Sequence, residues 1–357
     1  MLRDDRENQL SQLSACSAAS ATLVTPLKNE IENVAQMWEA IHKQTLLPGE
    51  WIIVDNGSTD GTYEWLSSHA SRSGIAVKVL SLPGYTIAQM MNAAIKRAQY
   101  EVIACCHGGT RIPPDWFRNL LSPILADQGV EVVAGVWEVV GETDFERWVA
   151  RSYIAMGLCD IDPSRYLPAS RSLAFLRSTW ARVSGFPEWL PRFGEDTLFG
   201  IRLRAAEARF VIATDAKVGW RPNSAPMRYL RQQRYYAEAN AHMGITRSIS
   251  PRLAVASLTV AVGILSGSVI TCAAFLSAVI FIDFGRLHVK GVRVTPGAYL
   301  FWKWLIPFIA ISGTLKGWMD RMRRTVTRPA MDKVAVAIYL GRPERGTNHL
   351  SAFSDKQ

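Results

Sequence analysis

The chain has 357 residues, 48% of them hydrophobic and 20% charged, which is enough apolar material for a sizeable core and excludes a disordered chain. Its five cysteines show neither paired metal-ligand spacing nor the density of a disulfide scaffold, which favours a reducing compartment. The net charge of +9 is concentrated between residues 286 and 330, directly after a long uncharged run. A basic stretch in that position favours an anionic membrane surface and excludes nucleic acid as the expected partner.

The first 20 residues are polar and rich in Ser and Ala, and residues 331–357 end in a similar polar stretch, so we expect a flexible tail at each end. The N-terminus is charged from its third residue, with no apolar run behind it, and does not resemble a secretory signal. We therefore expect a cytoplasmic N-terminal domain.

Short β-rich runs alternate with amphipathic helical patterns from about residue 21 to residue 216, which predicts βαβ units and a mostly parallel sheet. A helix is predicted over 31–44, where apolar residues recur at helical spacing. The predicted strands span residues 21–27, 50–55, 77–82, 101–106, 130–139 and 208–215. Ligands of such α/β folds bind at the carboxyl ends of the strands, so polar residues there are candidates for the site.

The second predicted strand runs into Asp55 and the turn Asn56–Gly61, which opens a helix that Asp60 can cap. This pattern is compatible with an ordinary strand-turn-helix corner and with a ligand-binding carboxylate at a strand end.

A second acidic motif, Glu195-Asp196, begins a helical pattern, where backbone N–H groups and the helix dipole keep a carboxylate ionised. An ionised carboxylate can serve as a general base, although acids at a helix start also serve simply as caps.

Four tracts occur in order: ATLVTPLKNE, WIIVDNGSTDGT, GGTRIPPDWFRNLL and GFPEWLPRFGEDTLFGIRL. Together they resemble family 2 glycosyltransferases of the GT-A nucleotide-diphospho-sugar transferase fold, over residues 21–240. The tract PASRSLAFLRSTWARVSGFPEWL is similar to a bacterial membrane-associated subgroup that has a Ser-Arg-Ser element and C-terminal membrane helices.

The resemblance implies an inverting transfer of a hexose-type sugar from a nucleotide-sugar donor to a lipid-linked or polysaccharide acceptor, as in cell-envelope biosynthesis. It implies that Asp196 is the base that takes the acceptor proton, with Glu195 beside it. The donor-binding residues that it implies are Thr25, Pro26, Asp55, Asn92, His107, Gly109 and Arg171. Arg171 would face a phosphate or the acceptor.

Two positions depart from the family pattern. His107 stands where the family places a metal-binding Asp, and Met91 precedes Asn92 where the family has a phosphate-binding Arg. The expected divalent cation, Mn or Mg, would then have His107 as its ligand; if the metal is lost, a protonated His107 or a nearby Arg would contact the diphosphate. A catalytically silent homologue that binds sugar nucleotides or scaffolds a membrane assembly is the alternative.

Downstream, Trp220 and Arg221 precede a cluster that includes Gln232 and Arg234. By resemblance these residues belong to the segment that closes over the diphosphate and acceptor. An amphipathic helix with a solvated polar face explains the same pattern.

The segment 241–330 is expected to associate with the inner membrane. Residues 253–282 contain no charge, which suits a shallow hairpin broken near Ser266-Gly267-Ser268 or a tilted single span. Residues 298–319, rich in Trp and aromatic residues with two lysines, are predicted to lie along the membrane. A buried helical pair of a soluble protein is the other interpretation.

Overall fold

A computed structural model describes residues 18–155, 161–163, 165–245, 277, 280–281, 284–285 and 295–341. The chain divides into two compact units: Met1–Glu138, Asp162–Arg221 and Arg328–Gln357 form the first, and Val139–Ile161 and Pro222–Thr327 the second. Residues 139–161 and 222–240 of the catalytic domain that the sequence predicts over 21–240 fall in the second unit, and the bounds of that domain stay a prediction. The predicted hairpin at 253–282 lies outside the described residues.

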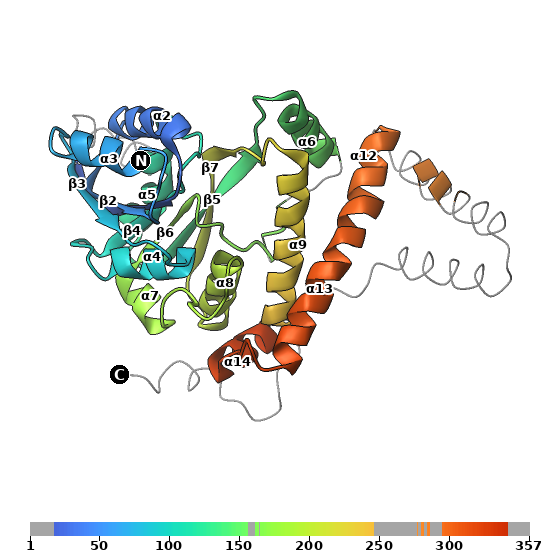
Figure 1. Ribbon diagram of the computed structural model, residues 1–357. Coiled ribbons are helices and arrows are strands. Elements are labelled where there is room, and N and C mark those ends of the chain that lie inside the picture. The colour runs from blue at the N-terminus through green and yellow to red at the C-terminus, as the bar shows by residue number, and fades with distance from the viewer. Residues whose placement is uncertain are drawn as a thin grey trace, which may run out of the picture. The chain divides into compact units, whose positions relative to one another are not determined.

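A seven-stranded sheet, in the order β3-β2-β1-β4-β6-β5-β7, forms the centre of the first unit (Figure 1). Four strands pair in parallel: β1 (Ala18–Leu27), β2 (Leu47–Asp55), β3 (Ala76–Ser81) and β4 (Val102–Cys105). Strand β6 (Leu173–Leu176) runs antiparallel to both β4 and β5 (Val132–Val139), and β7 (Phe210–Trp220) completes the order. The α/β class is confirmed, and the six predicted strands all form; β6 is the one that the sequence pattern did not predict.

The register brings the carboxyl ends of the first three strands into one row, because Leu27 pairs with Asp55 and Asp55 with Ser81. The tip of β2 therefore lies between its two neighbours at the edge of the sheet where ligands of α/β folds bind.

Alternation along the strands fills a hydrophobic core on each side of this sheet. Trp51 and Ile53 face one core, with α2 (Ile31–His42), α3 (Thr62–Ala70) and α5 (Trp116–Ala126). Ile52 and Val54 face the other core, with α4 (Ile87–Ile95) and α8 (Glu195–Ala205). The short helix α7 (Arg177–Arg182) follows β6.

The C-terminal segment 331–357 does not begin as a tail, contrary to the sequence prediction. Residues Ala330–Tyr339 form α14, which belongs to the first unit and packs on α8. Its apolar side buries Ala335 and Val336.

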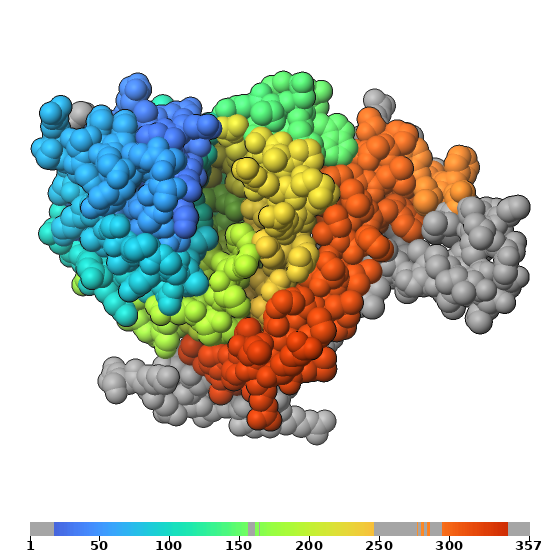
Figure 2. Space-filling model, in the orientation of Figure 1, coloured from blue at the N-terminus to red at the C-terminus, as the bar shows by residue number. Residues whose placement is uncertain are grey.

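The second unit contains α6 (Asp144–Ala155), α9 (Pro226–Met243), α12 (Pro296–Leu300) and α13 (Ile306–Met322). Helices α9 and α13 pack along each other (Figures 1 and 2). Glycines permit this close approach: a Cβ at Gly313 would lie 2.1 Å from the carbonyl oxygen of Arg234, and one at Gly317 would lie 2.6 Å from Ala241 Cβ. Two small residues four positions apart let helix backbones approach in this way.

One π-helical turn, Phe301–Leu305, joins α12 to α13. Pro307 follows it, and a proline has no N–H to donate and clashes with the carbonyl four residues earlier. A π turn just before the proline relieves that clash while the helix continues. Pro296–Met322 therefore forms one helix of 27 residues.

Candidate active site

Asp55 ends β2, and only one of the two oxygens of its buried carboxylate accepts a hydrogen bond from the described residues. Its Oδ2 accepts the amide hydrogen of Ser58 at 2.9 Å, whereas its Oδ1 is buried and has no hydrogen-bond partner among the described residues. A buried polar atom without a partner is costly, so this oxygen is suited to accept a donor from a ligand.

The turn after Asp55 is held in shape by its own side chains. Gly57 has a φ of +65°, and a Cβ there would lie 2.8 Å from that of Pro83. Asp60 accepts the amide hydrogens of Thr62 and Ile31, each at 3.1 Å. Gly61 is the N-cap of α3, and Asp60, one residue earlier, accepts from the first residue of both α3 and α2.

The side chain of Thr25 points into the core and away from this edge. Its hydroxyl accepts the indole hydrogen of Trp51 at 2.9 Å and lies 3.1 Å from the sulfur of Cys106. The Pro26 carbonyl accepts the amide hydrogen of Gly108 at 3.3 Å, so this pair of residues fixes the loop after β4. The structure therefore gives the Thr25 side chain a packing role, in place of the donor contact that the resemblance implied.

Glu30, which the sequence analysis did not select, lies against the glycines of the loop after β4. A Cβ at Gly109 (φ +74°) would lie 3.1 Å from Glu30 Oε2, and that oxygen accepts a hydrogen bond from Asn33 at 2.8 Å. Burial raises the pKa of Glu30, and the charge of Asp60 adds to the effect. The signal that the sequence offered for Glu30 is its place as the last residue of the tract ATLVTPLKNE.

The Ser-Arg-Ser element divides its three side chains between the core and the site. Ser172 is buried, accepting the indole hydrogen of Trp116 and donating to the Ala216 carbonyl, each at 2.9 Å. Ser170 and His107 Nε2 form a hydrogen bond of 2.8 Å. The central Arg171 therefore projects between two anchored neighbours.

Arg171 lies over two indole rings. Its Cζ is 5.1 Å from the centre of the Trp137 ring and 5.0 Å from that of Trp220, and the two rings meet edge to face. Among the described residues it makes no hydrogen bond or ion pair. Stacking on aromatic faces orients the guanidinium and leaves its fork of N–H donors for an anion.

The imidazole of His107 is neutral because its pKa is low. Burial and the nearby Arg171 charge lower its pKa to about 3. With Nε2 bonded to Ser170, Nδ1 is the ring nitrogen left for a ligand.

The Glu195-Asp196 pair begins α8, as predicted, directly after Gly194 in a left-handed conformation. Asp196 Oδ1 accepts the amide hydrogen of Thr197 at 2.7 Å, and Oδ2 has no partner among the described residues. Glu195 is buried, with an unpartnered Oε2. Burial and the neighbouring Asp196 charge raise the pKa of Glu195 to about 8, against the opposing charge of Arg171. Glu195 is therefore protonated at neutral pH.

The structure does not bring Asn92 to this group. Its amide nitrogen donates to the Phe186 carbonyl and to Glu188 Oε1, and its oxygen accepts from the Trp180 indole and the Phe186 amide. All four hydrogen-bonding positions of the side chain are thus filled by protein groups. The implied donor contact by Asn92 is replaced by a role in holding the loop before α8.

The remaining candidates divide between the two units. Trp220 ends β7, Arg221 follows it, and the Arg221 charge acts on Glu30. Gln232 and Arg234 lie on α9 in the second unit. The structure therefore groups Trp220 and Arg221 with the strand ends, and it does not bring Gln232 and Arg234 into that unit.

Within the part of the chain that the structure describes, one other group of side chains has the geometry of a metal site. The ligand atoms of Glu238, His242 and Asp320 lie within 4.8 Å of one another in the second unit. Lys316 Nζ lies 2.5 Å from Asp320 Oδ2 and 3.7 Å from Glu238 Oε1. An ammonium group already balances these carboxylates, so the cluster is an ion-pair network joining α9 to α13.

Asp55 at a strand end, a stacked arginine and a helix-start acid pair form the candidate site of this α/β unit, and comparisons with known proteins indicate its class. Residues 22–186 match the family profile described as Glycosyl transferase family 2. Over these residues the chain is similar to family 2 glycosyltransferases, in agreement with the resemblance seen in the sequence. No curated protein sequence matches it.

Solved structures include similar folds. A mannosyltransferase from Pyrobaculum calidifontis, in complex with GDP-Man and Mn²⁺, has a TM-score of 0.61 at 19% identity, covering 85% of this chain and 88% of that one. GalNAc-T7 with UDP, GalNAc and Mn²⁺ has a TM-score of 0.45 at 15% identity, covering 62% of this chain and 50% of that one. TarS from S. aureus has a TM-score of 0.43 at 16% identity, covering 61% of this chain and 39% of that one. The first likeness supports the GT-A fold.

Proposed function

We propose that this glycosyltransferase moves a hexose-type sugar from a nucleotide-sugar donor to a lipid-linked or polysaccharide acceptor at the cytosolic face of the inner membrane, with inversion at the anomeric carbon. The observation that carries the proposal is the unpaired guanidinium of Arg171 beside the acid pair at the start of α8. An anion site next to a general base is what transfer from a diphosphate to a hydroxyl requires.

On the donor side, Asp55 Oδ1 is the acceptor for a base or ribose hydrogen, because it is buried and unpartnered. Arg171 is the phosphate-binding group, held by Trp137 and Trp220. Its charge opposes the negative charge that develops on the leaving nucleoside diphosphate. Trp220 and Arg221 line this same end of β7.

On the acceptor side, Asp196 is the base. The Thr197 amide fixes Oδ1, so Oδ2 is the oxygen that takes the proton from the acceptor hydroxyl. The hydroxyl oxygen then bonds to the anomeric carbon as the bond to the diphosphate breaks on the opposite face, which inverts the configuration. Glu195, protonated near neutral pH, keeps a second negative charge away from the diphosphate.

The side chains near His107 suit a divalent cation. A neutral imidazole is the ligand form of His, and a metal-bound His usually donates its other ring N–H to an acceptor, which here would be the Ser170 hydroxyl beside Nε2. The mannosyltransferase structure contains Mn²⁺. A cation held by His107 Nδ1, with Glu30 against the neighbouring glycines, would neutralise diphosphate charge.

A donor panel tests both the function and the metal. We expect membrane-purified protein to release one nucleoside diphosphate, with markedly better turnover in Mn²⁺ than in Mg²⁺, because imidazole prefers the softer ion. His107→Ala should weaken Mn²⁺ binding measured by electron paramagnetic resonance, and His107→Asp should restore the use of Mg²⁺. Turnover that chelators leave untouched would exclude the metal, and no turnover with any donor or ion would favour the silent homologue.

The acid pair predicts a pH dependence of stability. The pKa of Glu195 is raised from 4.5 to about 8 in the folded state, so between these values the folded protein holds a proton that the unfolded chain releases. Stability from this group therefore falls as pH rises from about 4.5 to about 8. We expect the melting-temperature difference between wild type and Glu195→Gln to shift in favour of the variant over this range. Glu64→Gln, an exposed acid on α3, should show no such trend.

Membrane association is proposed from α13. Among the described residues Pro296–Met322 is the one helix long and apolar enough to cross a membrane, and 22% of its most apolar window is buried. The glycines face α9, whereas Phe308, Leu315, Met319 and Met322 are exposed at helical spacing on another face. Arg321, Arg323 and Arg324 lie at its end. An apolar face beside basic residues suits the surface of an anionic leaflet.

A lipid-depth measurement tests this orientation. An environment-sensitive fluorophore on a cysteine at Phe308 or Met322 should be quenched by nitroxide-labelled lipids in anionic vesicles. The same label at Lys333, exposed on α14, should be quenched much less. Equal quenching at all three positions would contradict a lipid-facing α13.

A further inference from the structure

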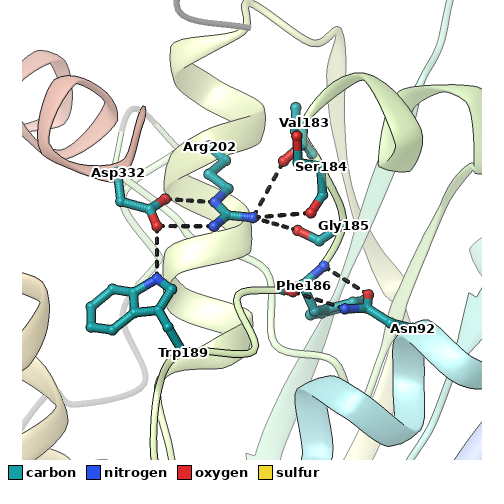
Figure 3. Close-up of polar contacts among 8 residues, drawn as sticks. All are labelled: Asn92, Val183, Ser184, Gly185, Phe186, Trp189, Arg202 and Asp332. Carbon is teal, nitrogen blue, oxygen red and sulfur yellow. Dashed lines mark hydrogen bonds and ion pairs between the residues drawn. The ribbon is translucent and has the colours of Figure 1, made fainter. Parts of the chain in front are cut away.

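The last described helix supplies a buried acid to the catalytic unit (Figure 3). Asp332 on α14 has no exposed surface, and its carboxylate accepts three hydrogen bonds. Arg202 on α8 donates two of them, from Nε at 2.6 Å and from Nη2 at 2.9 Å, and the Trp189 indole donates the third at 2.7 Å. A bidentate pair of this kind fixes the relative position of the two helices.

Arg202 carries this connection to a turn of the backbone. Its remaining nitrogen, Nη1, points at the carbonyl oxygens of Val183, Ser184 and Gly185, at 3.3, 3.3 and 2.7 Å. Ser184 and Gly185 have φ values of 58° and 65°, so the turn is in the left-handed region. One guanidinium therefore joins α14, α8 and this turn, as Figure 3 shows.

The same segment is held from the other side by α4. Asn92 makes two hydrogen bonds with the backbone of Phe186, both at 2.9 Å, and donates a third to Glu188 at 2.7 Å. Residues 183–189 are thus held by hydrogen bonds from Asn92 on one side and from the Arg202–Asp332 pair on the other. This segment leads directly to Gly194 and the acid pair Glu195-Asp196.

We propose that Asp332 is a positioning residue for the catalytic acids. Through its pair with Arg202, Asp332 on α14 fixes the position of the loop 183–194 and of the first residues of α8. Helix α14 follows the second unit in the chain, although it belongs to the first. The role rests on the proposed function of Asp196. Arg202 follows Glu195 by seven residues, two helical turns, so a shift of Arg202 moves the acid pair along the same helix.

Stability alone does not explain a buried ion pair here. Well-packed apolar side chains of similar size often stabilise a core as well as such a pair does, whereas the pair adds direction and register. The Arg202–Asp332 pair has that directional character, because each guanidinium nitrogen donates to a different oxygen atom. Nε and Nη2 donate to the two carboxylate oxygens of Asp332, and Nη1 donates to the Gly185 carbonyl. Small displacements of catalytic groups are costly to rate.

The test uses full-length protein carrying Asp332→Asn, with Lys333→Ala on the exposed side of the same helix as the matched control. Hydrogen exchange read by mass spectrometry should speed up in residues 183–196 of Asp332→Asn and stay unchanged in β1 and β2. At a temperature well below melting, kcat should fall at least ~10-fold while the donor KM stays within about twofold. Asp332→Glu should recover part of the loss.

A lower melting temperature with unchanged kcat per folded molecule would overturn the proposal, and so would unchanged exchange in residues 183–196. If Asp332→Asn does not fold, Trp189→Phe, which removes only the indole donor, is read by the same two measurements. The exchange result needs no turnover. A wild type that is inactive with every donor would therefore contradict the proposed function while exchange still decides whether Asp332 holds the loop.

Discussion

Asp196→Asn is expected to lower kcat for sugar transfer by on the order of 10³-fold, because the variant keeps the shape of the side chain and loses its basicity. Donor affinity and melting temperature should stay near those of the wild type, since Asp196 is partly exposed and its one described contact is with the neighbouring Thr197. Initial-rate kinetics and donor titration by calorimetry check both parts.

Glu195→Gln is the matched comparison for this variant. It removes the neighbouring carboxylate and leaves Asp196 in place, so transfer should survive at neutral pH. Full transfer activity in Asp196→Asn would refute its assignment as the base, and loss of activity in both variants would assign the proton transfer to the pair acting together.

Arg171→Ala is expected to lower kcat/KM by roughly 10²-fold or more, because it removes the unpaired cation proposed to oppose the leaving diphosphate. It should also weaken the binding of the free nucleoside diphosphate. Since Arg171 makes no ion pair with the described residues, the melting temperature should change little.

Arg171→Lys separates charge from geometry. A lysine keeps the charge but lacks the planar fork that stacks on Trp137 and Trp220, so the variant should recover only part of the loss. Arg72→Ala, which removes an exposed cation, is the control for net charge. Unchanged diphosphate binding in Arg171→Ala would show that another group neutralises the phosphates.

Much of the fold followed from local patterns. Trp51 and Ile53 alternate with Ile52 and Val54 between two cores, which is the period that predicts a strand covered on both faces. Strand β6 was missed because its four residues sit inside a motif-rich tract and give too short a run for any periodicity. It is also the strand that pairs antiparallel on both sides.

The candidate site rests on local motifs in outline. The strand-end rule and the motif order predict Asp55, Arg171 and the acid pair as site residues, whereas contacts across the sheet had no local signal. Ser170 and His107 are 63 residues apart, and Asn92 reaches Phe186 across 94 residues. Thr25 could have been placed in the core, because it shares its strand face with the buried Leu23.

The 130 residues that separate Arg202 from Asp332 bear on how the protein is made. When residues 1–221 have left the ribosome, the sheet can form, but the guanidinium of Arg202 has no counter-charge for its buried position until α14 emerges. A nascent chain at that stage is an incomplete enzyme, because the segment between residue 221 and α14 must be synthesised before Asp332 can pair with Arg202. A chain terminated prematurely before Asp332 would therefore be a poor enzyme and a substrate for quality-control proteases, even with every catalytic side chain present.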